Sequence, residues 1–544
     1  MAPQSPNTFT NPILPGGYPD PSICRVGNDF YLVNSSFEYF PGLPLHHSKD
    51  LVNWELVGYG LHRADQCVGK MNLVDVQSRG GIHAPTLRYH EGTFYLITTN
   101  VYVPPGDNQP TQFINFILTA QEIAGPWSEP HILPGAPGID PDIFFDTDGK
   151  VWVAGTHSPT KPNFPGEGEI WLQEIDLANW RLIGERYFLW RGACGGVWVE
   201  GPHLYKRDGR YYLIVAEGGT SFNHAVMVAV SDAITGPYTP NPRNPILSSR
   251  HLSYDYWVNS VGHADMVELA DGRWFMVALG IRNESGRGSN MGRETHLIPI
   301  TWEREPFEWQ EIKYEWPVCA PATGRVERFN PLPLPNNRQN RSDAFFDNFS
   351  LPTLHPEWNF RRVPLPDTYS LHARKNHLRL FARPEDFQER GRCSFLGLRQ
   401  KESDFTYAAS LEFWPTSDGV DAGIVLFQQD NLWLKMVVRR ENGRYHLRLV
   451  FAAPAKAPAL LAQETLPHYS GEIILQVAAG NGRYHYTYSL DKGVSFQPLA
   501  ETAANLILSR GYTGAYLGVL ATGNGRATQA YADFAWVRYV MRDA

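Results

Sequence analysis

The sequence predicts an all-β protein with two domains, a five-bladed β-propeller followed by an antiparallel β-sandwich. Two observations lead to this prediction. A motif of two short strands joined by a tight turn recurs five times in the first part of the chain, and many further short strands without heptads follow it. At 544 residues the chain is also too long for one ordinary core.

The repeat begins each time at a polar residue, after which come an apolar strand, a turn and an aromatic-rich strand. Its start positions are 63, 57, 60 and 63 residues apart: Asp20, His83, Asp140, Glu200 and His263. The turn follows each start at a similar distance: Asn28–Asp29, Glu91–Gly92, Asp148–Gly149, Asp208–Gly209 and Asp271–Gly272. Because Asp-Gly between alternating apolar runs is a strong hairpin signal, each repeat should open with a hairpin.

Each hairpin is followed by further strand-like segments. The clearest of them are residues 44–48, 116–120, 170–175, 225–231 and 294–300. Each repeat is therefore expected to be a four-stranded sheet, which is the unit of a propeller blade, and we assign residues 1–330 to a five-bladed propeller. The rival interpretation is a stack of unrelated hairpins.

Residues 331–341 are rich in Pro and Asn and are predicted to be a linker. Residues 342–544 are assigned to the β-sandwich because short alternating strands recur there between Gly and Asn turns. The expected strands are 343–349, 378–381, 407–413, 423–427, 433–438, 445–451, 472–478, 484–489 and 530–540. This domain carries no catalytic motif, so it could be a packing partner, a sugar-binding module or a lid on the propeller.

Charge and composition exclude several classes of partner. The net charge is −8, so neither nucleic acid nor an anionic membrane is an expected partner. No apolar run is long enough to span a membrane. The first ten residues do not resemble a signal peptide, so we expect a cytoplasmic protein, although a secreted protein trimmed of its signal would look the same. The five scattered cysteines are interpreted as reduced thiols.

The five repeat starts carry the candidate chemistry. Corresponding residues of successive blades converge on one end of the central channel, so five titratable side chains should meet there. Glycoside hydrolysis needs a carboxylic acid and a carboxylate on opposite sides of the scissile bond. Asp20 and Glu200 belong to different blades, which leaves room for a water molecule and favours inversion. Asp140 would raise the pKa of the acid by like-charge repulsion. The rival interpretation is that each carboxylate belongs to a turn, since Asp before Pro is common there.

The motifs also resemble a known family over nearly the whole chain. They are Tyr-Pro-Asp-Pro-Ser (18–22), Ser-Phe-Glu-Tyr-Phe-Pro-Gly (36–42), His-Ser-Lys-Asp-Leu-Val-Asn-Trp (47–54), Gly-Ile-Asp-Pro (138–141), Glu-Gly-Pro-His-Leu-Tyr (200–205), Gly-His-Ala-Asp (262–265) and Gly-Arg-Glu-Thr (292–295). In order and spacing these resemble glycoside hydrolase family 43. The resemblance implies an inverting mechanism with Asp20 as general base, Glu200 as general acid and Asp140 as the pKa modulator.

The resemblance implies further roles around these carboxylates. Arg293 would contact sugar hydroxyls, and its rival role is a surface ion pair with Glu294. Phe37 would line the sugar pocket or simply pack in the core. His263 would lie under the pocket near a calcium ion held mostly through waters, and its rival role is that of a core histidine. No organic cofactor is expected.

Two features of the sequence leave the sugar specificity and the rim of the pocket undecided. His83 stands where many members of this family carry Trp or Tyr, so the choice between xylose and arabinose is in doubt. The segment 511–525 is expected to be a loop reaching over the pocket, with Tyr512 or Tyr516 at its rim.

The sequence therefore predicts an exo-acting glycosidase that releases xylose, L-arabinose or both from xylan-derived oligosaccharides. The alternatives are an arabinofuranosidase only, a retaining furanosidase of the invertase type, and a non-catalytic sugar-binding propeller. The invertase motifs Asn-Asp-Pro-Asn and Arg-Asp-Pro are absent from the sequence. A homo-oligomer is compatible with the surfaces of both predicted domains.

Overall fold

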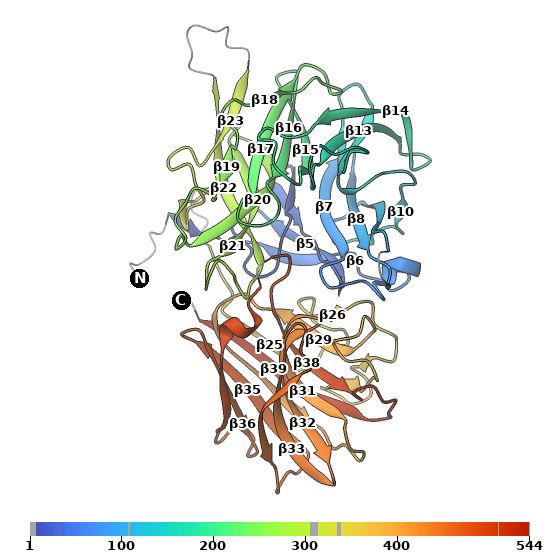
Figure 1. The fold of residues 1–544 in the computed structure, drawn as a ribbon, viewed down its shortest axis with the longest axis vertical. Helices are drawn as coiled ribbons and strands as arrows, with labels where there is room; N and C mark the ends of the chain where they lie inside the picture. Colours follow the sequence, from blue (N-terminus) through green and yellow to red (C-terminus); the bar gives the residue numbers. More distant parts are fainter. Residues whose placement is uncertain (1–6, 107–108, 305–313, 335–338, 510, 543–544) are drawn as a thin grey trace.

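The computed structural model describes residues 7–106, 109–304, 314–334, 339–509 and 511–542. These residues form a propeller, coloured blue to yellow in Figure 1, and a sandwich, coloured yellow to red below it. The described residues contain only two short 3-10 helices, η1 (Gly69–Asn72) and η2 (Ala504–Ile507). Among the described residues no helix is long and apolar enough to cross a membrane.

The propeller has five antiparallel sheets, which confirms the predicted repeat. The first blade consists of β2 (Ser22–Val26), β3 (Asp29–Val33), β5 (Gly42–Ser48) and β6 (Glu55–Leu61). The second consists of β7 (Gly81–His90), β8 (Thr93–Tyr102), β9 (Gln112–Ala120) and β10 (His131–Ile132). The third consists of β11 (Ile139–Phe145), β12 (Val151–His157), β13 (Glu169–Asp176) and β14 (Arg181–Trp190). The fourth blade consists of β15 (Glu200–Arg207), β16 (Arg210–Glu217), β17 (Ala225–Ser231) and β18 (Thr239–Pro240), and β19 (Leu247–Ser248) also pairs with β17. The fifth consists of β20 (Val258–Glu268), β21 (Trp274–Arg282), β22 (Arg293–Arg304) and β23 (Glu315–Cys319).

The first strand of every blade lines the central axis. Each of these strands contacts the first strand of the next blade, and β2 of the first blade contacts β20 of the last, so the ring is closed. Outside the ring, β1 (Thr8–Thr10) pairs with β24 (Phe329–Pro331) and joins the two ends of this region. The starts of the inner strands therefore converge, as the repeat predicted.

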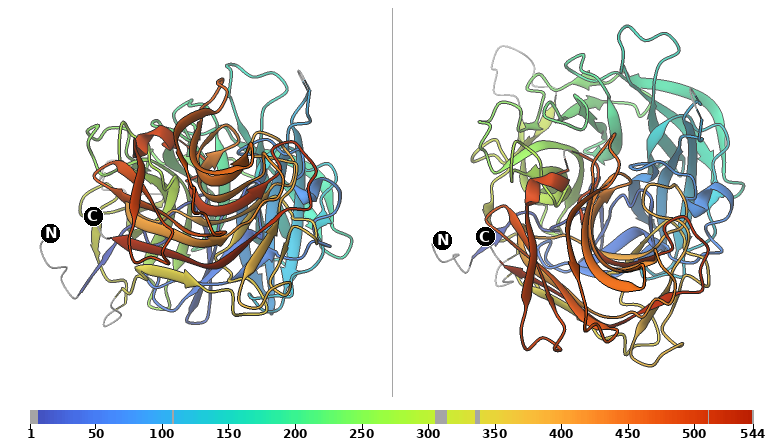
Figure 2. Two further views of the ribbon diagram at one scale, coloured as in Figure 1. Left: turned by 90° about the horizontal axis from the view of Figure 1, so that it is seen from below. Right: turned by 60° about the horizontal axis from the view of Figure 1, so that its bottom comes forward.

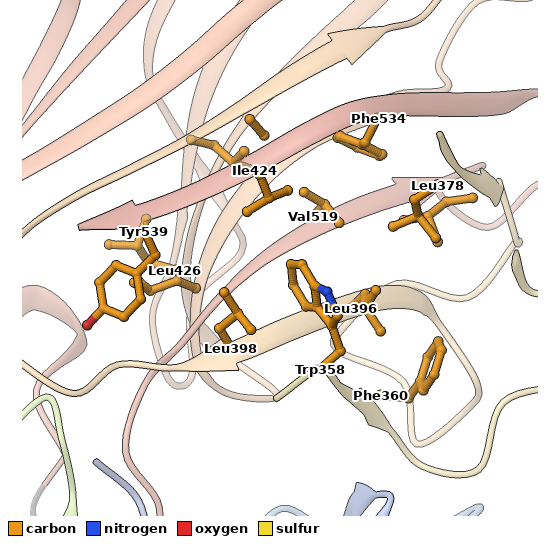
Figure 3. Close-up of a cluster of buried hydrophobic side chains, with 14 of the residues drawn as sticks. Trp358, Phe360, Leu378, Leu396, Leu398, Ile424, Leu426, Val519, Phe534 and Tyr539 are labelled. Atoms are coloured by element: carbon orange, nitrogen blue, oxygen red, sulfur yellow. The ribbon is translucent and has the colours of Figure 1, made fainter. Parts of the chain in front are cut away.

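The sandwich consists of two antiparallel sheets that face each other across an apolar core. One contains β25 (Ala344–Asp347), β27 (Tyr369–Ser370), β28 (Leu378–Phe381), β30 (Asp404–Glu412), β35 (Glu472–Gly480), β36 (Arg483–Ser489), β37 (Gln497–Ala503) and β39 (Tyr531–Arg542). The other contains β26 (Asn359–Arg361), β29 (Ser394–Arg399), β31 (Asp421–Gln429), β32 (Leu432–Glu441), β33 (Arg444–Ala452), β34 (Ala459–Thr465), β38 (Tyr516–Thr522) and one short propeller strand. Figure 3 shows Leu396, Ile424 and Val519 of this second sheet gathered with Phe534 of the first in the core.

The two domains share this second sheet. The propeller strand is β4 (Tyr39–Phe40), which pairs with β26 and so forms an edge of the sandwich sheet. One apolar cluster accordingly runs from the first two blades, for example Leu43 and Met71, into the sandwich. The linker prediction falls partly on residues 335–338, which lie outside the described residues, and the exact domain limits stay a prediction.

The expected loop over 511–525 is mostly wrong. Residues Tyr516–Thr522 form β38, a buried strand between β31 and β29. The run Ala515–Ala521 is apolar, as expected for a strand covered on both faces. Tyr516 is therefore not at the pocket rim, because its ring is buried and stacks on Tyr39 with centroids 4.0 Å apart.

Candidate active site

Backbone irregularities aim the repeat starts into the channel. In four blades the pairing of the first two strands shifts register just after the start, at His83, Asp140, Glu200 and His263. Such bulges re-aim side chains next to active sites. Three repeat starts also have left-handed backbone conformations, with φ of 50° at Asp20, 55° at Asp140 and 44° at His263. Non-glycine residues seldom adopt this conformation, and it is concentrated at functional sites.

Asp20 is held as a buried carboxylate. Arg293 donates from Nη1 to Oδ1 of Asp20 at 3.0 Å and from Nη2 to Oδ2 at 3.3 Å. The Ser35 hydroxyl donates to Oδ2 at 2.6 Å, and Nδ1 of His263 lies 3.9 Å from Oδ1. Burial raises the pKa of Asp20, but Arg293, His263 and Ser35 outweigh it and hold the pKa below its ordinary value. Asp20 is therefore ionised, with an oxygen suited to accept a proton.

Asp140 and Glu200 form a coupled pair with the opposite property. Burial and the charges of Glu200 and Asp20 raise the pKa of Asp140, although the Gly201 amide donates to its Oδ2 at 3.1 Å. Burial and the charge of Asp20 raise the pKa of Glu200 to about 7. Because the two carboxyl groups repel each other's charge, they titrate as one unit. The pair therefore retains a proton at a pH at which Asp20 has lost its own.

An aromatic wall stands beside Asp20. The ring of Phe37 lies edge-on to His83 and Tyr512, with centroid distances of 5.0 and 5.9 Å. The guanidinium carbon of Arg293 lies 4.8 Å from the Tyr512 ring centroid, and Nε of Arg293 donates to the Tyr512 carbonyl at 3.3 Å. Burial lowers the pKa of His83 to about 4, so this imidazole is neutral at the pH of the coupled pair. Propeller and sandwich thus build the pocket wall together.

The structure settles the rival placements of two residues. Arg293 is buried against Asp20, whereas Glu294 pairs with Arg282, whose Nε lies 2.6 Å from its Oε2. The surface pair between Arg293 and Glu294, which was the rival interpretation, is thus not formed. Phe37 is buried, and it also packs against the pocket residues His83 and Tyr512.

Three polar residues beside the site carry no pattern of their own in the sequence. Ser35 binds Asp20, and Thr220 accepts from Nη1 of Arg293 at 3.0 Å. Glu217 ends β16, and its carboxylate accepts the amide hydrogens of Ala193 and Cys194 at 2.9 and 3.1 Å, fixing the loop before Glu200. Only the fold shows that Glu217 and Thr220 lie beside the carboxylates.

The channel below His263 holds a second charged layer. Arg88 donates to Asp142 at 3.0 Å and to Asp265 at 2.8 Å, and both carboxylates are fully buried. Arg88 also contacts Nδ1 of His203 at 3.1 Å. Calcium prefers six to eight oxygen ligands. Within the described ranges no three His, Cys, Asp or Glu side chains form a metal-ligand group, and the nearby carboxylates are paired with arginines. These residues do not fit a calcium ion held by protein ligands.

Family models match both domains. Residues 9–306 match the model of glycosyl hydrolases family 43, and residues 346–540 match the β-xylosidase C-terminal concanavalin A-like domain. A xylosidase/arabinosidase of Butyrivibrio fibrisolvens is 39% identical over 97% of this chain and 98% of that protein. A non-reducing end α-L-arabinofuranosidase of Bacteroides ovatus is 36% identical over 98% of this chain and 95% of that protein.

Solved structures agree with these matches. A xylan β-1,4-xylosidase of Bacillus halodurans superposes with a TM-score of 0.88 at 31% identity, covering 98% of this chain and 100% of that one. The Bacteroides ovatus xyloglucan-locus protein of family 43 superposes with a TM-score of 0.86 at 35% identity, again over 98% and 100%. Similarity thus extends over both domains, and the site has ionised and protonated carboxyl groups. The chain belongs to glycoside hydrolase family 43 and is an inverting glycosidase.

Proposed function

We propose that this glycosidase removes single xylose or L-arabinose units from the ends or branches of xylan-derived oligosaccharides, with Asp20 as base and Glu200 as acid. One observation carries the assignment of roles. Asp20 is a carboxylate neutralised by Arg293, whereas Asp140 and Glu200 retain a proton between them. An inverting glycosidase needs one carboxyl group in each of these two states.

The reaction then runs in one displacement. A water molecule gives a proton to Asp20 as its oxygen attacks the anomeric carbon. Glu200 protonates the leaving oxygen as the glycosidic bond breaks, and the released sugar has the opposite anomeric configuration. Asp140 keeps Glu200 protonated before the reaction by repelling its anionic form. Arg293 would hold sugar hydroxyls while it fixes the orientation of Asp20.

The proposed substrate follows from the ring cluster beside Asp20 and from the relatives. Phe37, His83 and Tyr512 pack together on one side of the site, where they would block an extended chain and favour a terminal sugar ring. The relatives are named for xylose and for arabinose release. The proposal of both xylose and arabinose as products therefore agrees with the names of the relatives. Exo action agrees with the ring cluster on one side of Asp20.

A single experiment tests this proposal. Rates are measured on p-nitrophenyl β-D-xylopyranoside and α-L-arabinofuranoside, and proton NMR follows the anomer first released. We expect turnover of one or both substrates with inverted product. Asp20→Asn should reduce kcat by about 10²- to 10⁴-fold, since it removes the general base while Asn tolerates the left-handed backbone. Full activity of that variant, or retained configuration, would contradict the proposal.

The arabinofuranosidase-only alternative keeps one specific observation in its favour. His83 presents a small neutral ring at the pocket wall, and the Bacteroides ovatus relative is named for arabinofuranose release. Turnover of the arabinofuranoside without the xyloside would select this alternative. The predicted homo-oligomer and the cytoplasmic location stay predictions.

A further inference from the structure

Trp198 is an exposed aromatic side chain beside the proposed acid. It lies two residues before Glu200 and is 52% exposed, which is unusual for an indole next to a buried site. Its backbone has a φ of 55°, a strained conformation for a bulky residue. Because such strain persists where the surroundings enforce it, this position of the ring requires an explanation.

Neighbouring loops hold the backbone at Trp198 and lie close to its indole. The Trp198 amide donates to the Gly166 carbonyl at 2.7 Å, and the Gly218 amide donates to the Val197 carbonyl at 2.8 Å. A Cβ atom added to Gly219 would lie 2.9 Å from Cδ1 of Trp198, and one added to Gly166 would lie 3.2 Å from Cε2. Glycine at both positions therefore lets two loops approach the indole closely, which restricts where its ring can lie.

These loops lie at the end of the propeller where the carboxylates converge. The antiparallel pairing of β15 with β16 places Glu200 opposite Ala216, so the loop that follows β16 emerges at the pocket end. In the third blade, Ile139 lies opposite Thr156, so the loop containing Gly166 emerges at the same end. Thr220, next to Gly219, binds Arg293, which in turn binds Asp20. A short chain of contacts therefore links Trp198 to the reacting centre.

The pocket wall decides where the rest of a substrate can go. Phe37, His83 and Tyr512 cover the side of the first two blades and the sandwich. A general acid must contact the leaving oxygen, so the leaving group lies on the side of Glu200. Trp198 is an exposed aromatic residue just before β15, the strand that begins with Glu200. Flat indole faces bind the apolar faces of sugar rings.

We propose that Trp198 forms a leaving-group subsite, a platform for the sugar ring that is released from the terminal xylose or arabinose. This inference rests on the proposed function, because Glu200 defines the leaving side. The ligand class is a neutral pyranose ring of the oligosaccharide backbone.

Substrates that share the released sugar but differ in the leaving group test this subsite. The leaving group of xylobiose is a sugar ring, whereas the leaving group of β-D-xylopyranosyl fluoride is only a fluoride ion. The matching arabinose pair is arabinofuranosyl-xylobiose and α-L-arabinofuranosyl fluoride. For Trp198→Ala we expect kcat/KM on the sugar-leaving substrate to fall by about 10- to 100-fold, with the fluoride rate within about twofold of the wild type.

Two further variants separate binding from structural effects. Trp198→Phe should recover most of the lost kcat/KM, because it keeps an aromatic face. Trp414→Ala removes another exposed indole, 55% exposed in the sandwich, and should leave both rates unchanged. Equal loss on sugar and fluoride in Trp198→Ala, or no loss on either, would overturn the proposal. A wild-type enzyme inactive on all four substrates would instead contradict the proposed function.

Discussion

At the scale of single residues, Glu200 has the property that a general acid needs. Burial and the charge of Asp20 raise its pKa, so it carries a proton near neutral pH. Glu200→Gln removes this proton while keeping the shape. We expect kcat on xylobiose to fall by about 10²- to 10⁴-fold, because its leaving sugar needs protonation. A 2,4-dinitrophenyl xyloside should lose far less, since its leaving group departs unprotonated. Equal losses on both substrates would refute the role of Glu200.

Asp140 should act through the protonation of Glu200. Its left-handed backbone accepts Asn, so Asp140→Asn removes one carboxyl group of the coupled pair with little strain. The remaining carboxyl group no longer shares a proton with a second acid, so repulsion within the pair is lost and the pKa of Glu200 should fall. The alkaline limb of the kcat/KM profile should therefore move to lower pH by about one pH unit or more. An unchanged limb with a uniformly lower rate would assign Asp140 to substrate contact instead. The acid limb, which follows Asp20, serves as the internal control.

At the scale of strands, the inner strands carry a layer in which one arginine pairs with two buried carboxylates. Arg88 reaches from β7 to Asp142 on β11 and Asp265 on β20. Arg88→Met would leave two buried carboxylates without a cation, so we expect a loss of about 3–5 kcal/mol in the free energy of unfolding. Urea unfolding measures this loss. Arg304→Met, which breaks an exposed pair with Glu315, is the matched control and should cost less than about 1 kcal/mol.

The same layer leads us to expect that activity does not depend on calcium. Incubation with a chelator should leave kcat and the urea midpoint unchanged, because arginines already neutralise the carboxylates that a calcium ion would need. Activity lost to the chelator and restored by Ca²⁺ would contradict this expectation. It would then support an ion near His263 held through waters.

The sequence predicted the bounds of some strands correctly, both inside the propeller repeat and in the sandwich. Segment 225–231 coincides with β17, and 378–381 coincides with β28. The strand β38 was missed because one glycine interrupts its apolar run and others flank it, and glycines look like turns when the strand's neighbours are unknown. The edge strand β4 was missed because its two residues are held in extended conformation by β26, more than three hundred residues away.

The candidate site, too, could be predicted only in part from the sequence. The converging carboxylates could be predicted, because rotation relates the blades. The contacts of Ser35 and Thr220 could not be predicted, since single hydroxyl residues carry no periodic signal. The buried position of Tyr516 was missed for a similar reason, because its partner Tyr39 lies in the other domain.

At the scale of the whole molecule, the propeller and the sandwich form one structural unit. Figure 2 shows the sandwich covering one side of the propeller from two directions. Beyond the shared sheet, Arg282 of β21 donates to Glu402 of the sandwich at 2.6 Å, and Arg399 donates to the Gly17 carbonyl at 3.1 Å. Buried polar contacts of this kind are costly to break, because each leaves an unpaired group.

The shared sheet and the shared pocket wall make a joint prediction about stability and activity. The full chain should unfold in a single calorimetric transition, because separating the domains would expose the continuous apolar cluster and the edge of β26. A propeller truncated after residue 341 should be aggregation-prone and inactive, since it exposes β4 and loses Tyr512. Two well-separated transitions, or an active truncated propeller, would show that the domains are independent. Tyr512→Ala distinguishes the two effects of truncation: it removes only the half-buried pocket ring, so KM should rise about tenfold or more while the transition stays single.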